Sequence, residues 1–368
     1  MAKNRKTPDM NLPVWFDGQN INEALFCEEF LQERRIIFTN RAFFTPNGRV
    51  TDDIVLRGGV YEKLKNYTIS SVPQKIKNIM ELLKLEAMVD DFPPQPDRIH
   101  VANGTLMLDG RFIEGKKEIV QSRLPVSYNP NVAAPALWLN FLDGLLYEED
   151  IPTLQEFIGY CLIPSNKGQR MMVIKGNGGE GKSQIGAVLS AIFGTNMKDG
   201  SIGKISENRF ARADLEHILL CVDDDMRMEA LRQTNYVKSI VTAQGKMDLE
   251  RKGRQSYQGW MFARLLAFSN GDLQALYDRS DGFYRRQLVL TTKEIFNMNV
   301  RNEIKAQIIR AGMTMQEVVD LLSDEYGWSD SVSNLSAKLQ RESIRYKEVL
   351  ELADVLGYDI VWQQRREK

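Results

Sequence analysis

The spacing of apolar residues divides the chain into three zones that predict different structures. The middle zone, residues 167–295, alternates polar stretches of helical spacing with short apolar runs at Met171–Ile174, Ile218–Val222, Leu265–Phe268 and Gln287–Leu290. Such runs between helical segments are typical of strands in an α/β sheet. We therefore expect an α/β core in this zone.

The first zone, residues 1–166, mixes strand and helix signals. A turn tetrapeptide, Thr45–Gly48, separates the two apolar halves of RAFFTPNGRV and predicts a hairpin. Behind Pro73, apolar residues recur at helical spacing at Ile76, Ile79, Met80 and Leu83. We expect an α+β region that holds no catalytic cluster of its own.

The third zone, residues 302–368, shows helical periods only. The periods break at AGMT and at YGWSDS, where glycine and small polar residues favour turns. This pattern predicts a small all-helical domain. Three zones of this size fit a chain of 368 residues.

Composition excludes several classes of protein. The chain is 43% hydrophobic, enough for a globular core, and its net charge of -1 means that any surface for nucleic acid must be local. Three scattered cysteines without a C-x-x-C pair, and only two histidines, argue against a zinc site or a disulfide framework. No apolar run reaches about 18 residues. We expect a reduced, intracellular protein with no membrane span.

The candidate chemistry begins in IKGNGGEGKSQIG, between an apolar run and a helical period. Gly176, Gly181, Lys182 and Ser183 match the phosphate-binding pattern G-x-x-x-x-G-K-[ST]. Glycines let successive backbone N–H groups converge on phosphate oxygens, and the helix dipole attracts the same charge. We predict that the triphosphate is bound by Gly176, Asn177, Gly178, Gly179, Glu180, Gly181, Lys182, Ser183 and Gln184. The alternative is a glycine-rich connection without a ligand.

Two roles follow inside this loop. Lys182 would reach the β- and γ-phosphates, and Ser183 would be a ligand of Mg²⁺. A triphosphate site also needs acids, and HILLCVDDDM supplies three of them at the end of an apolar run. We expect Asp223 to hold the metal through water and Asp224 to orient or deprotonate the attacking water. The alternatives are an acidic helix cap and a polymerase-like pair of Asp223 and Asp225.

Two further polar sites lie near the ends of apolar runs. Asn270 follows RLLAFS, where its amide could touch the γ-phosphate or its water. Arg285 and Arg286 precede the last run, and one of them could reach a neighbouring subunit's γ-phosphate as an arginine finger. The alternatives are an ordinary strand-to-turn junction and a solvated arginine pair.

Five features follow one another along the chain: the glycine-rich loop, the acid-terminated strand, the basic stretch, the strand ending in asparagine and the arginine pair. In this order they resemble superfamily 3 helicases. The resemblance is closest to the helicase part of phage and plasmid primase-helicases, and VANGTLMLDG and LQEFIGYCLIP resemble the region before the ATPase in that family. It implies an AAA+-like P-loop core that uses ATP and Mg²⁺. It also implies a homo-hexameric ring that moves 3′ to 5′ on single-stranded DNA during replication, in the cytoplasm of a bacterial host.

The resemblance assigns roles by position. Lys182 and Ser183 match the Walker A pair, Asp223 and Asp224 the Walker B acids, Asn270 the sensor, and Arg285 or Arg286 the finger. The family also places a channel-facing hairpin within KSIVTAQGKMDLERKGRQSYQGW, which has five basic residues and two acidic ones. We predict phosphate contacts from Lys246, Arg251, Lys252 and Arg254. The alternative is a solvated basic loop.

The chain departs from this family in two ways. No carboxylate constellation for primer synthesis precedes the ATPase, so a separate primase is an expected partner. After the arginine pair, only the short link KEIFNMNVRN leads to a different domain. This shortened link puts ring closure and the position of the arginine in question.

The third zone resembles the helix-turn-helix domains of Cro and repressor proteins. A first helix ends at Gly312, Thr314 can cap the second, and Ser333–Gln340 would be the recognition helix. Its basic strip consists of Lys338, Arg341, Arg345 and Lys347. The resemblance implies binding to origin DNA, although the longer SDEYGWSDS turn departs from the tight turn of DNA readers. A helical oligomerisation module is the alternative.

The pattern as a whole favours an ATP-dependent replicative helicase of a phage, plasmid or other mobile element. The alternative is a nucleotide-switched DNA-binding initiator or regulator that does not unwind DNA. Turnover distinguishes the two, because only the helicase hydrolyses ATP continuously when single-stranded DNA is present.

Overall fold

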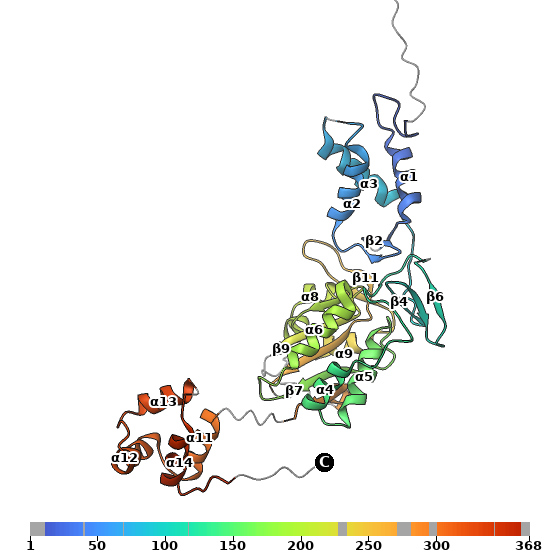
Figure 1. Cartoon of the computed structure of the whole chain (residues 1–368). Helices are drawn as coiled ribbons and strands as arrows, with labels where there is room; N and C mark the ends of the chain where they lie inside the picture. The colour runs from blue at the N-terminus through green and yellow to red at the C-terminus, as the bar shows by residue number, and fades with distance from the viewer. Residues whose placement is uncertain are drawn as a thin grey trace, which may run out of the picture. The chain divides into compact units, whose positions relative to one another are not determined.

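The computed structural model describes residues 12–39, 41–68, 70–116, 118–226, 234–270, 281–293, 300–341 and 343–361. Contacts along the chain separate it into two compact units, residues 1–294 and residues 295–368 (Figure 1). None of the helices in these described ranges is both long and apolar enough to cross a bilayer. The boundary near residue 166 stays a prediction.

A five-stranded parallel sheet forms the centre of the first unit, in the order β13-β7-β12-β9-β8. Its strands are β7 (Met171–Lys175), β8 (Met197–Asp199), β9 (Leu220–Met226), β12 (Arg264–Ser269) and β13 (Gln287–Thr291). The sheet confirms the α/β core expected from the apolar runs. The runs did not predict β8, because this edge strand is short and mostly polar.

Both faces of the sheet are covered, which explains why its strands read as continuous apolar runs. One face packs against α4 (Ala136–Leu145), α5 (Asp150–Cys161) and α6 (Lys182–Phe193). The other packs against α7 (Ile202–Glu207), α8 (Arg209–Ala213), α9 (Asn235–Thr242) and α10 (Asp281–Tyr284). Successive residues alternate between the two cores: Val222 packs on the α6 side and Cys221 on the α7 side. A short 3₁₀ turn, Gly194–Asn196, follows α6.

The N-terminal part of this unit has its own core beneath three helices, α1 (Glu23–Arg34), α2 (Asp53–Leu64) and α3 (Val72–Glu86). Its small antiparallel sheet consists of β1 (Ile37–Thr39), β2 (Ala42–Thr45) and β3 (Gly48–Arg49). The predicted turn is confirmed: the Asn47 N–H donates to Thr45 Oγ1, and Gly48 has the left-handed φ of 100° that this turn needs. The predicted helical spacing is confirmed in α3, which buries Ile79, Met80 and Leu83.

Two further antiparallel elements complete the first unit. One is the sheet β4 (Arg98–Val101), β5 (Gly104–Met107) and β6 (Phe112–Glu114), and the other is the hairpin β10 (Lys246–Leu249) and β11 (Tyr257–Trp260). Buried Arg123 donates hydrogen bonds to the carbonyls of Pro46, Val101 and Gly104. It thereby joins the β2–β3 turn to the β4–β5 sheet.

The second unit contains α11 (Val300–Arg310), α12 (Met315–Tyr326), α13 (Val332–Gln340) and α14 (Tyr346–Val355). These helices surround one apolar core, so the all-helical prediction is confirmed. Thr314 caps α12 as expected, in a reciprocal capping box with Glu317. Gly312 and Gly327 take left-handed φ values of 71° and 69° at the two predicted breaks.

Candidate functional site

The glycine-rich loop connects β7 to α6 at the carboxyl edge of the sheet. Gly178, Gly179 and Gly181 have φ values of 96°, 83° and 97°, a region that favours glycine. Gly176 is needed for a different reason: a Cβ there would lie 2.3 Å from Thr292 Oγ1. The loop therefore has a shape that other residue types would strain or block.

Lys182 begins α6 and is only 8% exposed. Its Nζ lies 2.8 Å from Glu180 Oε2 and 3.4 Å from Asn270 Oδ1. The other oxygen of Glu180 accepts a hydrogen bond from the Asn177 N–H. Although burial raises the pKa of Glu180, these hydrogen bonds outweigh burial and lower it. A carboxylate thus lies between the lysine and a loop amide, where the sequence predicted a phosphate.

Ser183 and Gln184 follow in the first turn of α6 and are exposed. The N-terminal end of a 12-residue helix carries partial positive charge from its unpaired N–H groups. Residues three apart share a helix face, so Ser183 lies on the same face as Gly186. The position of Ser183 is accessible to a ligand that enters the loop.

The two acids expected to act together lie on opposite faces of β9. Asp223 is buried, and its Oδ2 accepts a hydrogen bond of 2.7 Å from the Ile202 N–H at the start of α7. Burial raises its pKa, and the charges of Asp225 and Asp224 add to that effect while the Ile202 bond opposes it. Asp224 instead points toward α6: its Oδ1 lies 3.9 Å from the place of a Cβ on Gly186.

This geometry separates the two acids that we expected to act together. Side chains alternate along a regular strand, and Asp223 and Asp224 point to different sides of β9 at the point where its pairing with β12 becomes irregular. Asp224 lies beside the helix face that carries Ser183, whereas Asp223 ties β9 to α7. The metal-binding role that we gave to Asp223 stays a prediction, and of the two acids it is Asp224 that lies on the side of α6.

The structure brings Asn270 to the loop and leaves the arginine pair elsewhere. Besides its contact with Lys182, the Asn270 amide lies 3.9 Å from the place of a Cβ on Gly178. Arg285 and Arg286 precede β13, and the Arg286 carbonyl accepts a hydrogen bond from the N–H of Met171 at the far end of β7. Four residues of parallel strand span about 13 Å, so neither arginine can reach the loop of its own chain.

The basic hairpin is present, and its four predicted residues divide into two pairs. Lys246 lies 3.1 Å from Asp91, and Arg251 contacts Glu216 at 3.4 Å and the Tyr257 hydroxyl at 3.1 Å. Lys252 and Arg254 are exposed in the turn, where their side chains make no hydrogen bond or ion pair with another described residue. The prediction of a nucleic-acid contact thus rests most directly on the turn.

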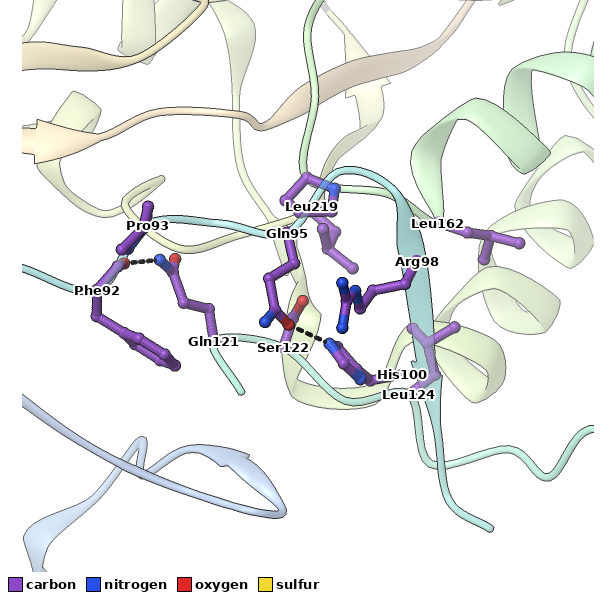
Figure 2. Close-up of a pocket in the computed structure, with 11 residues that line it drawn as sticks. Phe92, Pro93, Gln95, Arg98, His100, Gln121, Ser122, Leu124, Leu162 and Leu219 are labelled. Atoms are coloured by element: carbon purple, nitrogen blue, oxygen red, sulfur yellow. Dashed lines mark hydrogen bonds between the residues drawn. The ribbon is translucent and has the colours of Figure 1, made fainter. Parts of the chain in front are cut away.

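The histidines have structural roles. Figure 2 shows two hydrogen bonds among the residues that line one cavity. One joins His100 to Gln95, and in the other the Gln121 side chain donates to the Phe92 carbonyl. Burial lowers the pKa of His100 to about 4, and the charges of Arg123 and Arg98 add to this effect. The cavity beside it measures about 10 Å³, about the space of one water molecule. No cluster of three His, Cys, Asp or Glu side chains in the described part of the chain could hold a metal ion.

Two residues near the loop had no signal in the motif analysis. Thr292 is buried and approaches Gly176 from the strand next to β7. Phe141 on α4 lies 3.5 Å from the place of a Cβ on Gly181. Thr292 follows directly on β13, so a search for polar residues at every strand end would have found it. The Phe141 contact depends on how α4 packs.

In the second unit, the predicted basic strip is partly engaged within the protein. Lys338 lies 2.5 Å from Glu348 and over the ring of Trp328, and Lys347 lies 3.5 Å from Glu351. Arg341 and Arg345 are exposed. The predicted recognition helix corresponds to α13, but half of its strip already has an acidic partner.

Comparisons with known proteins give a family without an assigned role. Residues 174–286, less than half of the chain, match the family of unknown function DUF5906. No curated protein matches the chain. Among solved structures, one apo form of the NrS-1 C-terminal region is 14% identical, with a TM-score of 0.48 over 89% of this chain and 85% of that one. A second apo structure of that region, residues 305–718, is 14% identical, with a TM-score of 0.47 over 92% and 86%. Similarity at this level transfers no role.

Proposed function

We propose that the chain is an ATP-dependent DNA helicase that acts in the replication of a phage, plasmid or other mobile element. One observation carries this proposal: a glycine loop with left-handed conformations leads into a helix N-terminus, with Lys182 and Asn270 at the loop and Asp224 beside the first turns of that helix. Ligands of open α/β sheets bind at this edge. The loop is also shaped for an anion, because it already holds the carboxylate of Glu180.

The residues fit ATP with Mg²⁺. Lys182 would contact the β- and γ-phosphates, and the amides of Asn177–Gly181 would surround them. Ser183 would be a metal ligand and Asp224 would bind the same ion through water. Bound Mg²⁺ would neutralise charge on the phosphate oxygens. Asn270 would hold the attacking water or the γ-phosphate. This new contact would replace the one that Asn270 now makes with Lys182.

The arginine pair supports a ring of like subunits. Arg285 and Arg286 lie at the opposite edge of the sheet from the loop of their own chain. An arginine finger from this pair must therefore act on the site of a second copy. The same ring would place the hairpin turns around one DNA strand, as the resemblance to hexameric helicases implies. A separate primase and origin DNA are the partners that this proposal expects.

The test is ATP hydrolysis by the full chain with and without single-stranded DNA, together with displacement of a labelled strand. We expect stimulation by DNA and loss of hydrolysis by on the order of 10³-fold in Lys182→Ala. Lys167→Ala, an exposed lysine at the other edge of the sheet, is the matched control and should hydrolyse normally. ATP binding without turnover in the unmodified protein would favour the nucleotide-switched regulator instead.

A further inference from the structure

A pocket lined by arginines lies between the hairpin and the N-terminal sheet of the first unit. The cavity measures about 360 Å³, within the range of roughly 300–1,000 Å³ that is common for small-ligand pockets. Four arginines line it, Arg41 and Arg49 from the β1–β3 sheet and Arg251 and Arg254 from the hairpin turn. Figure 1 shows β2 above β11. Arg41 and Arg49 belong to none of the motifs described above.

The inner wall of this arginine pocket is fixed by a buried carboxylate. Glu216 accepts hydrogen bonds from Arg251 at 3.4 Å and from the Tyr257 hydroxyl at 2.6 Å, and its backbone carbonyl accepts one of 2.8 Å from Arg49. The Glu216 side chain is 3% exposed. Because the inner arginines are held in place, their remaining N–H groups are oriented before any ligand arrives.

The outer wall is available to a ligand. Arg41 is exposed, and its guanidinium stacks 4.9 Å from the centre of the Tyr257 ring. Arg254 is exposed in the hairpin turn, which is closed by a bond from its own N–H to the Arg251 carbonyl. Neither guanidinium has a hydrogen-bond or ion-pair partner among the described residues. These two cations can therefore turn toward an incoming anion.

The net positive charge of the residues that line the pocket favours an anion with two or more negative charges. Four guanidinium groups face two carboxylates, Asp53 and Glu216. His217 adds no charge at neutral pH, because burial lowers its pKa to about 3 and the charges of Arg49 and Arg251 add to that effect. A guanidinium group can donate two parallel hydrogen bonds to a phosphate, and a phosphate backbone presents one such group after another to neighbouring arginines.

We infer that this arginine pocket binds backbone phosphates of single-stranded DNA, so that the N-terminal part of the chain forms one wall of the DNA path. A second basic hollow of about 250 Å³ shares Arg251 and continues past Lys252 and Lys204. The two hollows thus flank the hairpin turn and suit a strand that runs across it. The inference rests on the proposed use of the hairpin for DNA, but it does not depend on ATP hydrolysis.

The test is the binding of a fluorescent oligothymidine to the full chain, without nucleotide, at several salt concentrations. Each arginine that contacts one phosphate contributes about 0.7 to the slope of log affinity against log salt on a single strand. We expect Arg41→Gln and Arg254→Gln each to reduce the slope by about 0.7, and the double variant by about 1.4. Arg254→Lys should retain most of the slope, because it keeps the charge.

Arg111→Gln is the matched control, since Arg111 is an exposed arginine in the β5–β6 turn that pairs with Asp109 at 2.7 Å. It should bind DNA like the unmodified protein. Thermal unfolding of each variant checks that the fold is retained. Equal slopes in the double variant and the unmodified protein would overturn the inference, as would binding of a labelled mononucleotide in this pocket without binding of the oligonucleotide. Normal slopes without ATPase activity would instead overturn the proposed function alone.

Discussion

Two buried glutamates of the first unit, Glu180 and Glu216, show how similar ion pairs can serve different purposes. Their side chains are 4% and 3% exposed, and each contacts a cation, Lys182 at 2.8 Å and Arg251 at 3.4 Å. Their pKa values shift in opposite directions. For Glu180 the hydrogen bonds outweigh burial and lower the pKa, whereas for Glu216 burial outweighs Tyr257, Arg251 and Arg49 and raises it.

The difference lies in what surrounds each carboxylate. Glu180 belongs to a loop whose glycines adopt left-handed conformations, and in the proposed function a phosphate would replace it between Lys182 and the Asn177 amide. The Glu216 carboxylate accepts hydrogen bonds from Arg251 and Tyr257 of the hairpin, and its backbone carbonyl accepts one from the N-terminal Arg49. The proposed function makes the first pair the closed state of a binding site, whereas the second pair joins the hairpin to the N-terminal sheet. Variants at and near each glutamate test this contrast.

The largest expected effect concerns the acid beside the loop. Asp224→Asn should reduce ATP hydrolysis by about 10²–10³-fold, because the carboxylate beside Gly186 that would bind Mg²⁺ through water is lost. Asp223→Asn, on the other face of β9, should affect hydrolysis much less and stability more. Steady-state hydrolysis of both variants is the measurement. Equal losses of activity at normal stability would contradict the assignment of Asp224.

The next effect concerns the pair that contains Glu216. Glu216→Gln removes the charge that accepts hydrogen bonds from Arg251 and Tyr257 but keeps the backbone carbonyl that Arg49 contacts, and loss of a hydrogen bond to a charged group costs about 1.5–3 kcal/mol. We expect a loss of that order in the free energy of unfolding in urea. Glu180→Gln should cost about 1 kcal/mol less in the same measurement, since Lys182 keeps its contact with Asn270. Similar losses in the two variants would remove the distinction between the pairs.

Lowering the pH should reduce the free energy of unfolding through the two buried histidines before the carboxylates are protonated. His100 and His217 have folded pKa values of about 4 and about 3, below the unfolded value of 6.5. The unfolded chain therefore binds more protons below pH 6.5, and stability falls as the pH decreases. Between pH 6.5 and 4.5 the expected loss is on the order of 3 kcal/mol. Urea unfolding at several pH values measures it, and a constant free energy over this window would show that these rings protonate in the folded protein.

The smallest effect is a gain. Glu180→Gln removes the negative charge that competes with the phosphates for Lys182, so nucleotide affinity should rise about tenfold, or roughly 1.4 kcal/mol. Binding of a fluorescent ATP analogue measures it. Gln184→Ala, which removes an exposed side chain from the first turn of α6, is the comparison variant. Weaker binding in Glu180→Gln would mean that the carboxylate supports the nucleotide rather than replacing it.

The sequence predicted the elements better than their contacts. Apolar runs found four strands of the sheet, because parallel strands buried on both faces have a simple pattern. The glycine spacing placed the loop, since its conformation is local. Alternation along β9 could have separated Asp223 from Asp224, but which of them faces α6 depends on how the helices cover the sheet. The pairing of Arg49 with Glu216 joins segments 167 residues apart, and no local pattern reports it.

The most direct test of the account is calorimetry of the full chain with a non-hydrolysable ATP analogue and Mg²⁺. The account predicts one bound nucleotide per chain, loss of the binding heat in Lys182→Ala, and stronger binding in Glu180→Gln. Absence of heat with the unmodified protein, or the same heat in Lys182→Ala, would contradict the claim that this loop is a nucleotide site.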